Sequence, residues 1–199
     1  MAKAKLQHVC SDCGAIHPKW AGQCSTCGQW NTLVEEVSLP TDVAAIPPAA
    51  SAPRLIGEID PLVGRPVTSG VAELDRVLGG GLVPGSVTLL GGEPGIGKST
   101  ILLQLLAAWP TTALYVTAEE SAQQVRLRAE RLDAVRDDLW LLAETSLPHV
   151  LAAIDETRPE IVVIDSIQTV HDPAIGSAPG SVSQVRGCAQ QLVNVAKLR

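Results

Sequence analysis

Two hydrophobic patterns alternate along the chain from about residue 67 onward. Short apolar runs of strand length, such as residues 113–117 and 161–165, are separated by stretches whose apolar residues recur at helical spacing. Strands that alternate with helices are typical of a mostly parallel sheet with crossover helices, so an α/β fold is predicted for residues 67–199. Further strands are predicted over 86–90 and 139–142, and helices over 71–78, 98–109, 121–132, 147–157 and from about 182 onward.

The residues before 67 lack this alternation and divide into two parts. Residues 1–37 contain four of the five cysteines and two of the four tryptophans. Residues 38–66 are rich in Pro and Ala without an apolar period, which is typical of an extended linker. We therefore expect a small zinc-binding module, a linker and an α/β domain. Because such a sheet normally continues into further strands, we also expect the α/β domain to be truncated at Arg199.

Composition, charge and hydropathy exclude several classes of protein. With 46% hydrophobic residues the chain can bury a core, but Phe is absent and aromatic residues make up only 3%, so that core must be aliphatic. The formal net charge of −6 argues against a protein that coats nucleic acid through bulk positive charge. No apolar stretch approaches the roughly 20 residues of a membrane span, and the N-terminus resembles no secretory signal. A cytoplasmic location without membrane contact is expected.

A phosphate-binding loop is predicted between the strand expected over 86–90 and the helix that follows. The spacing Gly92-x4-Gly97-Lys98-Ser99 matches the P-loop pattern in full, and a chance glycine-rich turn would not account for the flanking strand and helix. The glycines let backbone N–H groups turn toward one anion at a helix N-terminus. Lys98 is expected to reach the β and γ phosphates of ATP, and Ser99 to bind Mg²⁺. The predicted nucleotide-binding residues are Gly92, Glu93, Pro94, Gly95, Ile96, Gly97, Lys98, Ser99 and Thr100.

Carboxylates follow two of the predicted strands. Asp165 closes the apolar run of 161–165 and is predicted to hold Mg²⁺ together with Ser99, although it can instead cap the following turn. Glu119 and Glu120 follow the strand at 113–117, where hydrolysis needs a group that activates water. We choose Glu119 as the catalytic residue beside Lys98. Glu120 competes for this role, and both can instead be solvated residues that the helix dipole favours.

Four cysteines have the spacing of a metal site. Cys10-x2-Cys13-x10-Cys24-x2-Cys27 is typical of two knuckles that bind one Zn²⁺ through four thiolates. In a reducing compartment such thiols are metal ligands rather than disulfides. Some thirty residues cannot gain enough stability from a core, so we expect the module to be unfolded without metal.

Other polar residues give weaker indications. Two histidines near the cysteines, His8 and His17, are possible substitute ligands, but four cysteines already complete a tetrahedral shell. Cys188 is interpreted as a small buried apolar residue. Arg186 and Lys197 lie in or beside the segment after Asp165, where a ligand-responsive loop is expected, and are candidates for DNA contact. Four further arginines, Arg126, Arg128, Arg131 and Arg136, could indicate nucleic-acid contact. Because Glu130, Asp133, Asp137 and Asp138 alternate with them, a solvated helix face is the preferred interpretation.

The order of these motifs resembles one family closely. The zinc motif with Trp20 and Trp30, the segment 68–85 with its three consecutive glycines, and the P-loop are similar in that order to the bacterial RadA family, also called Sms. The resemblance implies a RecA-like ATPase core that uses Zn²⁺, Mg²⁺ and ATP. It implies a homo-oligomeric ring, expected as a hexamer, that extends recombination intermediates on single-stranded or branched DNA together with a RecA-type recombinase in homologous recombination and DNA repair.

The resemblance also assigns residues. It places Glu119 where RecA-type ATPases carry their water-activating Glu, residues 165–168 in the Walker B strand and its switch, and residues 180–186 in a DNA-facing loop and the following helix. Two departures matter. Gly187 stands where the family usually has an acidic residue. The family's Lys-Asn-Arg-Phe-Gly motif and its Lon-protease-like domain would follow residue 199, so we expect nucleotide binding here to be at most weakly coupled to DNA.

Two other hypotheses compete with the DNA-dependent ATPase. The chain could be a nucleotide-dependent assembly or regulatory module that resembles the circadian-clock RecA-like ATPases, but the zinc module favours the recombination ATPase. A zinc-ribbon adaptor with a purely structural P-loop domain is the third hypothesis. The combination of Lys98, Asp165 and Glu119 argues against that third hypothesis.

Overall fold

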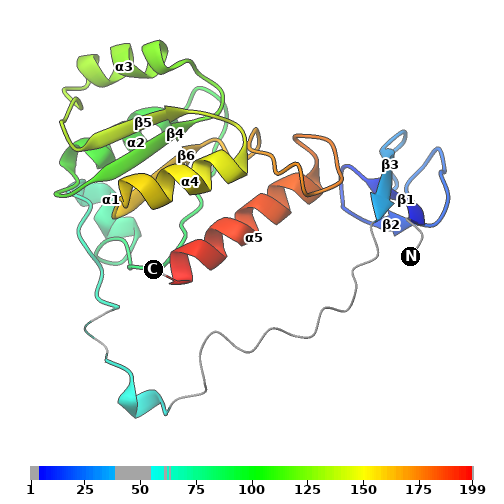
Figure 1. The fold of residues 1–199 in the computed structure, drawn as a ribbon, viewed down its shortest axis with the longest axis horizontal. Helices are drawn as coiled ribbons and strands as arrows, with labels where there is room; N and C mark the ends of the chain where they lie inside the picture. The colour runs from blue at the N-terminus through cyan, green and yellow to red at the C-terminus, as the bar shows by residue number, and fades with distance from the viewer. Residues whose placement is uncertain (1–4, 39–54, 61, 63, 199) are drawn as a thin grey trace.

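The computed structural model describes residues 5–38, 55–60, 62 and 64–198 (Figure 1). It contains a small antiparallel sheet near the N-terminus and a larger α/β domain. Most of the predicted linker lies outside the described residues. Where the linker is described, Ile56–Glu58 forms a single 3-10 turn (η1).

The N-terminal sheet has three strands in the order β2-β1-β3, all antiparallel. They are β1 (Lys5–Cys10), β2 (Ile16–His17) and β3 (Leu33–Ser38). The buried hydrophobic residues of this module in the described part of the chain are Val9, Cys10, Cys24 and Leu33, and Cys13 and Ala15 pack against the last three. Such a core is too small to stabilise about thirty residues by itself, because the apolar area removed from water is too small to offset the lost chain entropy.

The α/β domain contains a parallel sheet in the order β5-β4-β6, as the alternating pattern predicted. Its strands are β4 (Ala113–Thr117), β5 (Leu139–Ala143) and β6 (Ile161–Asp165). The register pairs Thr117 with both Ala143 and Asp165, so all three strands end at the same edge. Polar residues that follow these strands therefore gather at one edge of the sheet, which is where ligands bind in open α/β sheets.

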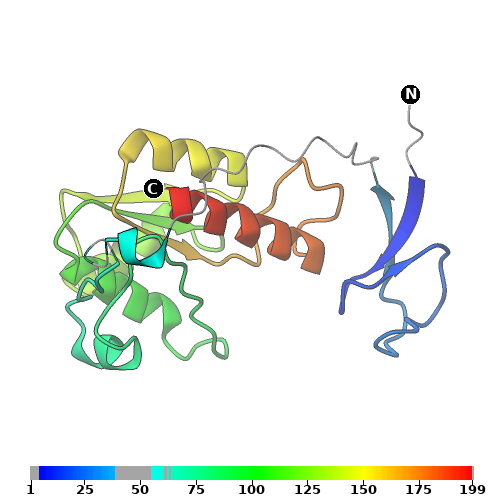
Figure 2. The same ribbon diagram turned by 90° about the horizontal axis from the view of Figure 1, so that it is seen from below.

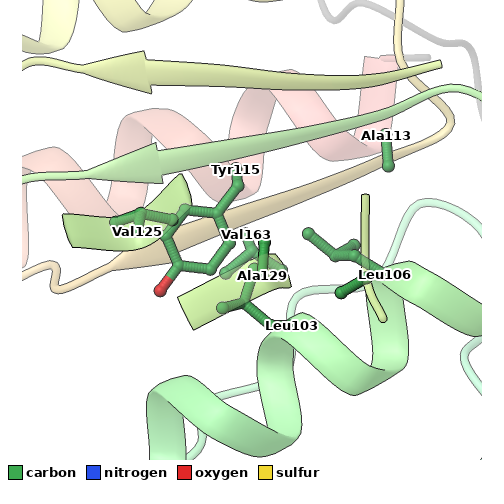
Figure 3. Packing of buried hydrophobic residues seen from close by; sticks show 8 residues of the cluster. Leu103, Leu106, Ala113, Tyr115, Val125, Ala129 and Val163 are labelled. Atoms are coloured by element: carbon green, nitrogen blue, oxygen red, sulfur yellow. The ribbon is translucent and has the colours of Figure 1, made fainter. Parts of the chain in front are cut away.

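Helices cover both faces of this sheet. On one face, α2 (Lys98–Ala108) and α3 (Ala122–Arg131) pack against β4 and β6 in a cluster that includes Leu103, Tyr115 and Val163 (Figure 3). On the other face, α4 (Leu147–Thr157) covers Leu114 and Val116 of β4. The alternation of Leu114 and Val116 with Tyr115 follows from the two-residue period of a strand.

A longer helix, α5 (Val182–Leu198), lies on the same face of the sheet as α4. Its Cys188 is fully buried against Leu147 of α4 and Val170, which confirms the interpretation of this cysteine as a small core residue. In two perpendicular views, α4 and α5 lie side by side (Figures 1 and 2). No helix in the described part of the chain is both long and apolar enough to span a bilayer.

The strand predicted over 86–90 is not formed. Among the described residues no strand pairs with this segment, and Val87 and Leu89 are 55% and 82% exposed. An apolar run becomes a strand only where a neighbour accepts its backbone hydrogen bonds. In the described sheet β6 is an edge strand that pairs with β4 alone, and residues 86–90 do not join its outer edge. The prediction of a paired strand before the P-loop was wrong for this structure.

Two backbone segments approach each other closely at the glycine-rich stretch that precedes residues 86–90. After the short helix α1 (Ala72–Val77), Gly81 adopts φ 137°, and a Cβ on it would lie 2.1 Å from the carbonyl oxygen of Val67. Two hydrogen bonds of 2.8 Å join Val67 to Leu82 at this crossing. Only glycine fits here, because a side chain would collide with backbone that cannot move aside.

One buried glutamine holds the loop between β6 and α5. Gln184, 1% exposed, accepts a hydrogen bond from the backbone N–H of Asp172 at 2.9 Å. Its amide nitrogen lies 2.9–3.1 Å from the carbonyl oxygens of Asp172, Ile175 and Ser177. Gly187 lies on the same helix, and a Cβ on it would approach Ile175 to 2.4 Å, so a side chain there would press on this loop.

We expect Gln184→Ala to lower the free energy of unfolding of the α/β domain by about 3 kcal/mol, because several buried backbone groups lose their partner at once. Urea unfolding followed by circular dichroism would measure the change. Gln190→Ala is the matched control on the same helix, since Gln190 is exposed and bonds only to Asn194; its effect should stay within about 0.5 kcal/mol. Equal effects of the two substitutions would contradict the role given to Gln184.

Candidate nucleotide and metal sites

The predicted P-loop lies at the N-terminus of α2. Gly95 and Gly97 have φ values of 80° and 102°, in the left-handed region, and Gly97 is the N-cap residue of the helix. Residues with a Cβ would be strained at both positions. The loop thus ends at the N-terminus of a helix, where free backbone N–H groups and the helix dipole favour an anion.

Lys98 folds back over this loop. Its Nζ donates hydrogen bonds to the carbonyl oxygens of Gly92 at 2.9 Å and Glu93 at 2.8 Å. The ammonium group therefore lies against the loop that is predicted to hold the phosphates. Two exposed carbonyl contacts are weak compared with a charge-assisted bond to phosphate, so this lysine is free to exchange one set of acceptors for the other.

The helix that carries the loop is anchored at its far end by one arginine. Arg136 donates to the carbonyl oxygen of Leu106 in the last turn of α2 at 2.8 Å, to that of the C-cap residue Trp109, and to that of Thr111 just beyond at 3.1 Å. Its guanidinium also pairs with Asp138 at 2.6 Å. Arg136 is therefore a helix cap rather than a free basic residue.

Asp165 lies at the carboxyl end of β6, as predicted, and its side chain is held from β4. The hydroxyl of Tyr115 donates to Asp165 Oδ2 at 2.6 Å. Burial, and then the neighbouring Asp165 carboxylate, raise the pKa of Tyr115 well above its ordinary value of 10, so the hydroxyl remains a donor at neutral pH. The backbone N–H of Ala118 donates to the Asp165 carbonyl at 2.8 Å.

Glu119 and Glu120 have different environments. Glu120 forms two 2.8 Å hydrogen bonds with the guanidinium of Arg128, and its backbone N–H is bound by Thr117. Glu119 is exposed and accepts a hydrogen bond from Ser166, the residue that follows Asp165. One carboxylate is thus part of an ion pair, while the other lies beside the predicted magnesium ligand.

The sequence did not single out Tyr115, the ion pair of Arg128 with Glu120 or the pairing of Ser166 with Glu119. The contact between Tyr115 and Asp165 joins residues 50 positions apart. One signal was present: the chain has a single tyrosine, and it stands within a predicted strand two residues before that strand ends. A lone aromatic hydroxyl in an apolar strand needs a hydrogen-bond partner when buried.

Some predicted partners share no direct contact. Within the described ranges, no hydrogen bond or ion pair joins the P-loop to Asp165 or Glu119. Packing connects them instead, because Leu103 of α2 belongs to the same cluster as Tyr115 and Val163. These side chains set the position of the P-loop helix relative to the carboxyl edge of the sheet (Figure 3).

The basic residues of the predicted helix face differ from one another. Arg131 is exposed and forms no ion pair among the described residues, as a solvated face requires. Arg126, Arg128 and Arg136 pair with Glu130, Glu120 and Asp138, and Arg128 and Arg136 are more buried than a solvated face requires. Arg186 and Lys197, in contrast, are exposed on α5. They lie 11 positions apart, which brings them to one face of the helix, roughly 16 Å apart.

The four cysteines converge as their spacing predicted. The sulfur atoms of Cys10, Cys13, Cys24 and Cys27 all lie within 4.8 Å of one another, and two of the pairs are 3.7 Å apart. Tetrahedral Zn²⁺ with Zn–S bonds of about 2.3 Å requires sulfur atoms about 3.8 Å apart. The donor set and its geometry therefore fit a closed, structural metal site.

The surroundings favour the thiolate form at two of the four sulfurs. At Cys13 and Cys27 backbone hydrogen bonds lower the pKa, but burial and the neighbouring sulfurs raise it by more, to about 12 for Cys27. The backbone N–H of Cys27, which donates toward the Cys24 sulfur, lowers the pKa of Cys24 to about 5, although burial acts in the opposite direction. Nε2 of His17 lies 3.4 Å from the Cys24 sulfur, so His17 contacts the sulfur of a ligand and is not one of the four converging ligand residues. A side-chain hydrogen bond with Thr32 lowers the pKa of Cys10. Such outer contacts stabilise metal-bound thiolates.

Comparisons with known proteins find a family for each part of the chain. Residues 8–35 match the family described as a rubredoxin metal binding domain, and residues 58–197 match the family described as an AAA domain. The chain is 50% identical over 208 residues to the DNA repair protein RadA of Pseudomonas aeruginosa, covering 99% of this chain and 45% of the relative.

Two further relatives with the same name give similar figures. Identity is 47% over 209 residues with the protein of Haemophilus influenzae, covering 100% of this chain and 46% of the relative. It is 44% over 208 residues with that of Bacillus subtilis, covering 100% and 45%. The chain thus spans about half the length of these relatives.

Proposed function

This chain belongs to the AAA domain family and, within it, to the RadA proteins, and from that membership we propose that it is the nucleotide-hydrolysing part of a DNA repair ATPase. One observation carries the proposal. The P-loop, with Gly95 and Gly97 in the left-handed region, leads directly into α2. The ammonium of Lys98 donates hydrogen bonds to carbonyl oxygens of this loop, and phosphate oxygens can replace these acceptors. A structural glycine turn would need neither the lysine nor its position.

In the proposed mechanism, the loop N–H groups bind the β phosphate and Lys98 stabilises charge on the β and γ phosphates. Ser99 and Asp165 would hold Mg²⁺, which neutralises charge on the phosphate oxygens when bound. Glu119 accepts a proton from the attacking water, and the hydrogen bond from Ser166 fixes its carboxylate. Glu120 is occupied by Arg128 and does not take part.

The DNA-related activity of the whole protein is part of the same proposal. The names of the relatives support a role in DNA repair, and the exposed face of α5 with Arg186 and Lys197 offers positive charge for single-stranded or branched DNA. We propose that a homo-oligomeric ring, expected as a hexamer, uses ATP hydrolysis to extend recombination intermediates alongside a RecA-type recombinase. A cytoplasmic location is expected for such work.

ATP hydrolysis by the full-length protein, measured with and without single-stranded DNA in the wild type and in Lys98→Ala, tests this function. We expect Lys98→Ala to weaken nucleotide binding at least about tenfold and to abolish turnover, because a charge-assisted bond to phosphate is lost. Lys19→Ala, an exposed lysine of the N-terminal module, is the control and should change neither quantity. If DNA altered neither turnover nor nucleotide affinity, the DNA-dependent role would be wrong even if ATP were hydrolysed.

A further inference from the structure

The only tyrosine of the chain is placed where its ring alone would be sufficient for packing. Tyr115 is 1% exposed, in a cluster with Leu103 and Val163 (Figure 3). A phenyl ring would fill this volume without a polar atom, whereas a buried hydroxyl is unfavourable unless it has a hydrogen-bond partner. The partner here is Asp165 Oδ2, at 2.6 Å.

The hydrogen bond from Tyr115 engages one carboxylate oxygen of Asp165 and leaves the other available for a ligand. Tyr115 and Asp165 lie on the same face of the sheet, because Tyr115 pairs with Val163 and side chains alternate along a strand. The backbone N–H of Ala118, the residue after β4, donates to the main-chain oxygen of Asp165 at 2.8 Å, so β4 and the residue that follows it fix both the side chain and the backbone of Asp165. Within the described residues, Tyr115 is the hydrogen-bond donor to this carboxylate, and Oδ1 is left for another ligand.

We propose that Tyr115 is a positioning residue for the divalent cation of the nucleotide site, acting through Asp165. The proposal rests on the proposed function, since Asp165 needs a defined orientation only if it holds Mg²⁺ or a water of its shell. Partners that orient metal-binding carboxylates usually contribute a factor of ten or more to metal affinity. The packing of the same ring against α2 also joins the P-loop helix to this carboxylate.

Tyr115→Phe tests this because it removes the hydroxyl and keeps the ring. Mn²⁺, which electron paramagnetic resonance detects, is titrated into the protein saturated with ADP, and a fluorescent ADP analogue reports nucleotide affinity in EDTA. We expect the dissociation constant for Mn²⁺ to rise about tenfold in Tyr115→Phe while metal-free nucleotide affinity remains unchanged. The readout does not depend on catalytic turnover.

Two comparisons separate positioning from a general structural effect. Thr111→Val removes another hydroxyl bound to a carboxylate, that of Glu160 at 2.7 Å, and should leave Mn²⁺ affinity unchanged. In an Asp165→Ala background, Tyr115→Phe should cause no further loss, because the hydroxyl acts through Asp165.

The possible results distinguish this inference from the proposed function. Unchanged Mn²⁺ affinity in Tyr115→Phe, with normal binding by the wild type, would overturn the positioning role alone, as would an undiminished effect in the Asp165→Ala background. A wild type that bound no nucleotide would overturn the proposed function and this inference together.

Discussion

Removing the metal from the four-cysteine site should unfold residues 5–38 and leave the α/β domain folded. The module buries little besides Val9, Cys10, Cys24 and Leu33, so its stability depends on the metal–thiolate bonds. Structural Zn²⁺ sites contribute about 10–16 kcal/mol of apparent binding free energy at neutral pH, far more than a core of this size. The α/β domain has its own core on both faces of its sheet and does not depend on the metal.

Hydrogen–deuterium exchange read by mass spectrometry can follow both parts in one sample. After chelation, or in Cys24→Ser, peptides from β1 and β3 should lose their protection completely, while peptides from β4 and β6 keep theirs. Metal analysis should find about one Zn²⁺ per chain in the wild type and almost none in Cys24→Ser.

The fifth cysteine provides the control for the metal prediction. Cys188→Ala changes a buried residue that lies far from the other four in sequence and packs in the α/β core. It should leave the metal content at one per chain and lower the stability of the α/β domain only moderately. Protection of β1 and β3 that survived complete chelation would show that the module folds without metal.

Glu119→Gln should reduce ATP turnover by about 10²- to 10⁴-fold and leave nucleotide affinity within about threefold. The amide keeps the size of the side chain and can still accept a hydrogen bond from Ser166, but it cannot accept a proton from water. Steady-state turnover combined with equilibrium binding of ADP separates a loss of chemistry from a loss of binding.

Glu120→Gln is the matched control, because the two carboxylates are neighbours in the sequence. It breaks a bidentate ion pair with Arg128, whose Nη1 already lacks a partner in the described structure. We expect a decrease of about 1–2 kcal/mol in the free energy of unfolding and turnover within about threefold of the wild type. If Glu120→Gln lost turnover and Glu119→Gln kept it, the two roles would have to be exchanged.

Local sequence was sufficient for most elements of the α/β domain. Residues Ala113–Thr117, Leu147–Thr157 and Ile161–Asp165 form the strand, helix and strand that their periodicity predicted. The helix α3 begins after Ser121, whose side chain and that of Gln124 form a capping box. Periodicity and capping depend on residues a few positions apart, so they can be recognised without knowledge of the rest of the fold.

Periodicity and capping could not predict which segments pair as strands. The run 86–90 has the apolar character of a strand, yet no strand in the described part of the chain pairs with it, and Leu89 is 82% exposed. Hydrophobic pattern gives a segment its preference for a buried, extended conformation. Whether a neighbouring strand is available depends on the order of strands in the sheet, which the pattern of one segment does not contain.

By itself, the sequence determined the chemistry that is available: four thiols at metal spacing, a loop of glycines that ends in Lys98 and Ser99, and carboxylates at two strand ends. Only the tertiary structure decided how these groups are used. It paired Glu120 with Arg128 and Glu119 with Ser166, and it placed the hydroxyl of Tyr115 on Asp165. The physical reason is distance along the chain, because a side chain's role depends on its partner, and packing alone brings partners 47 and 50 positions apart into contact.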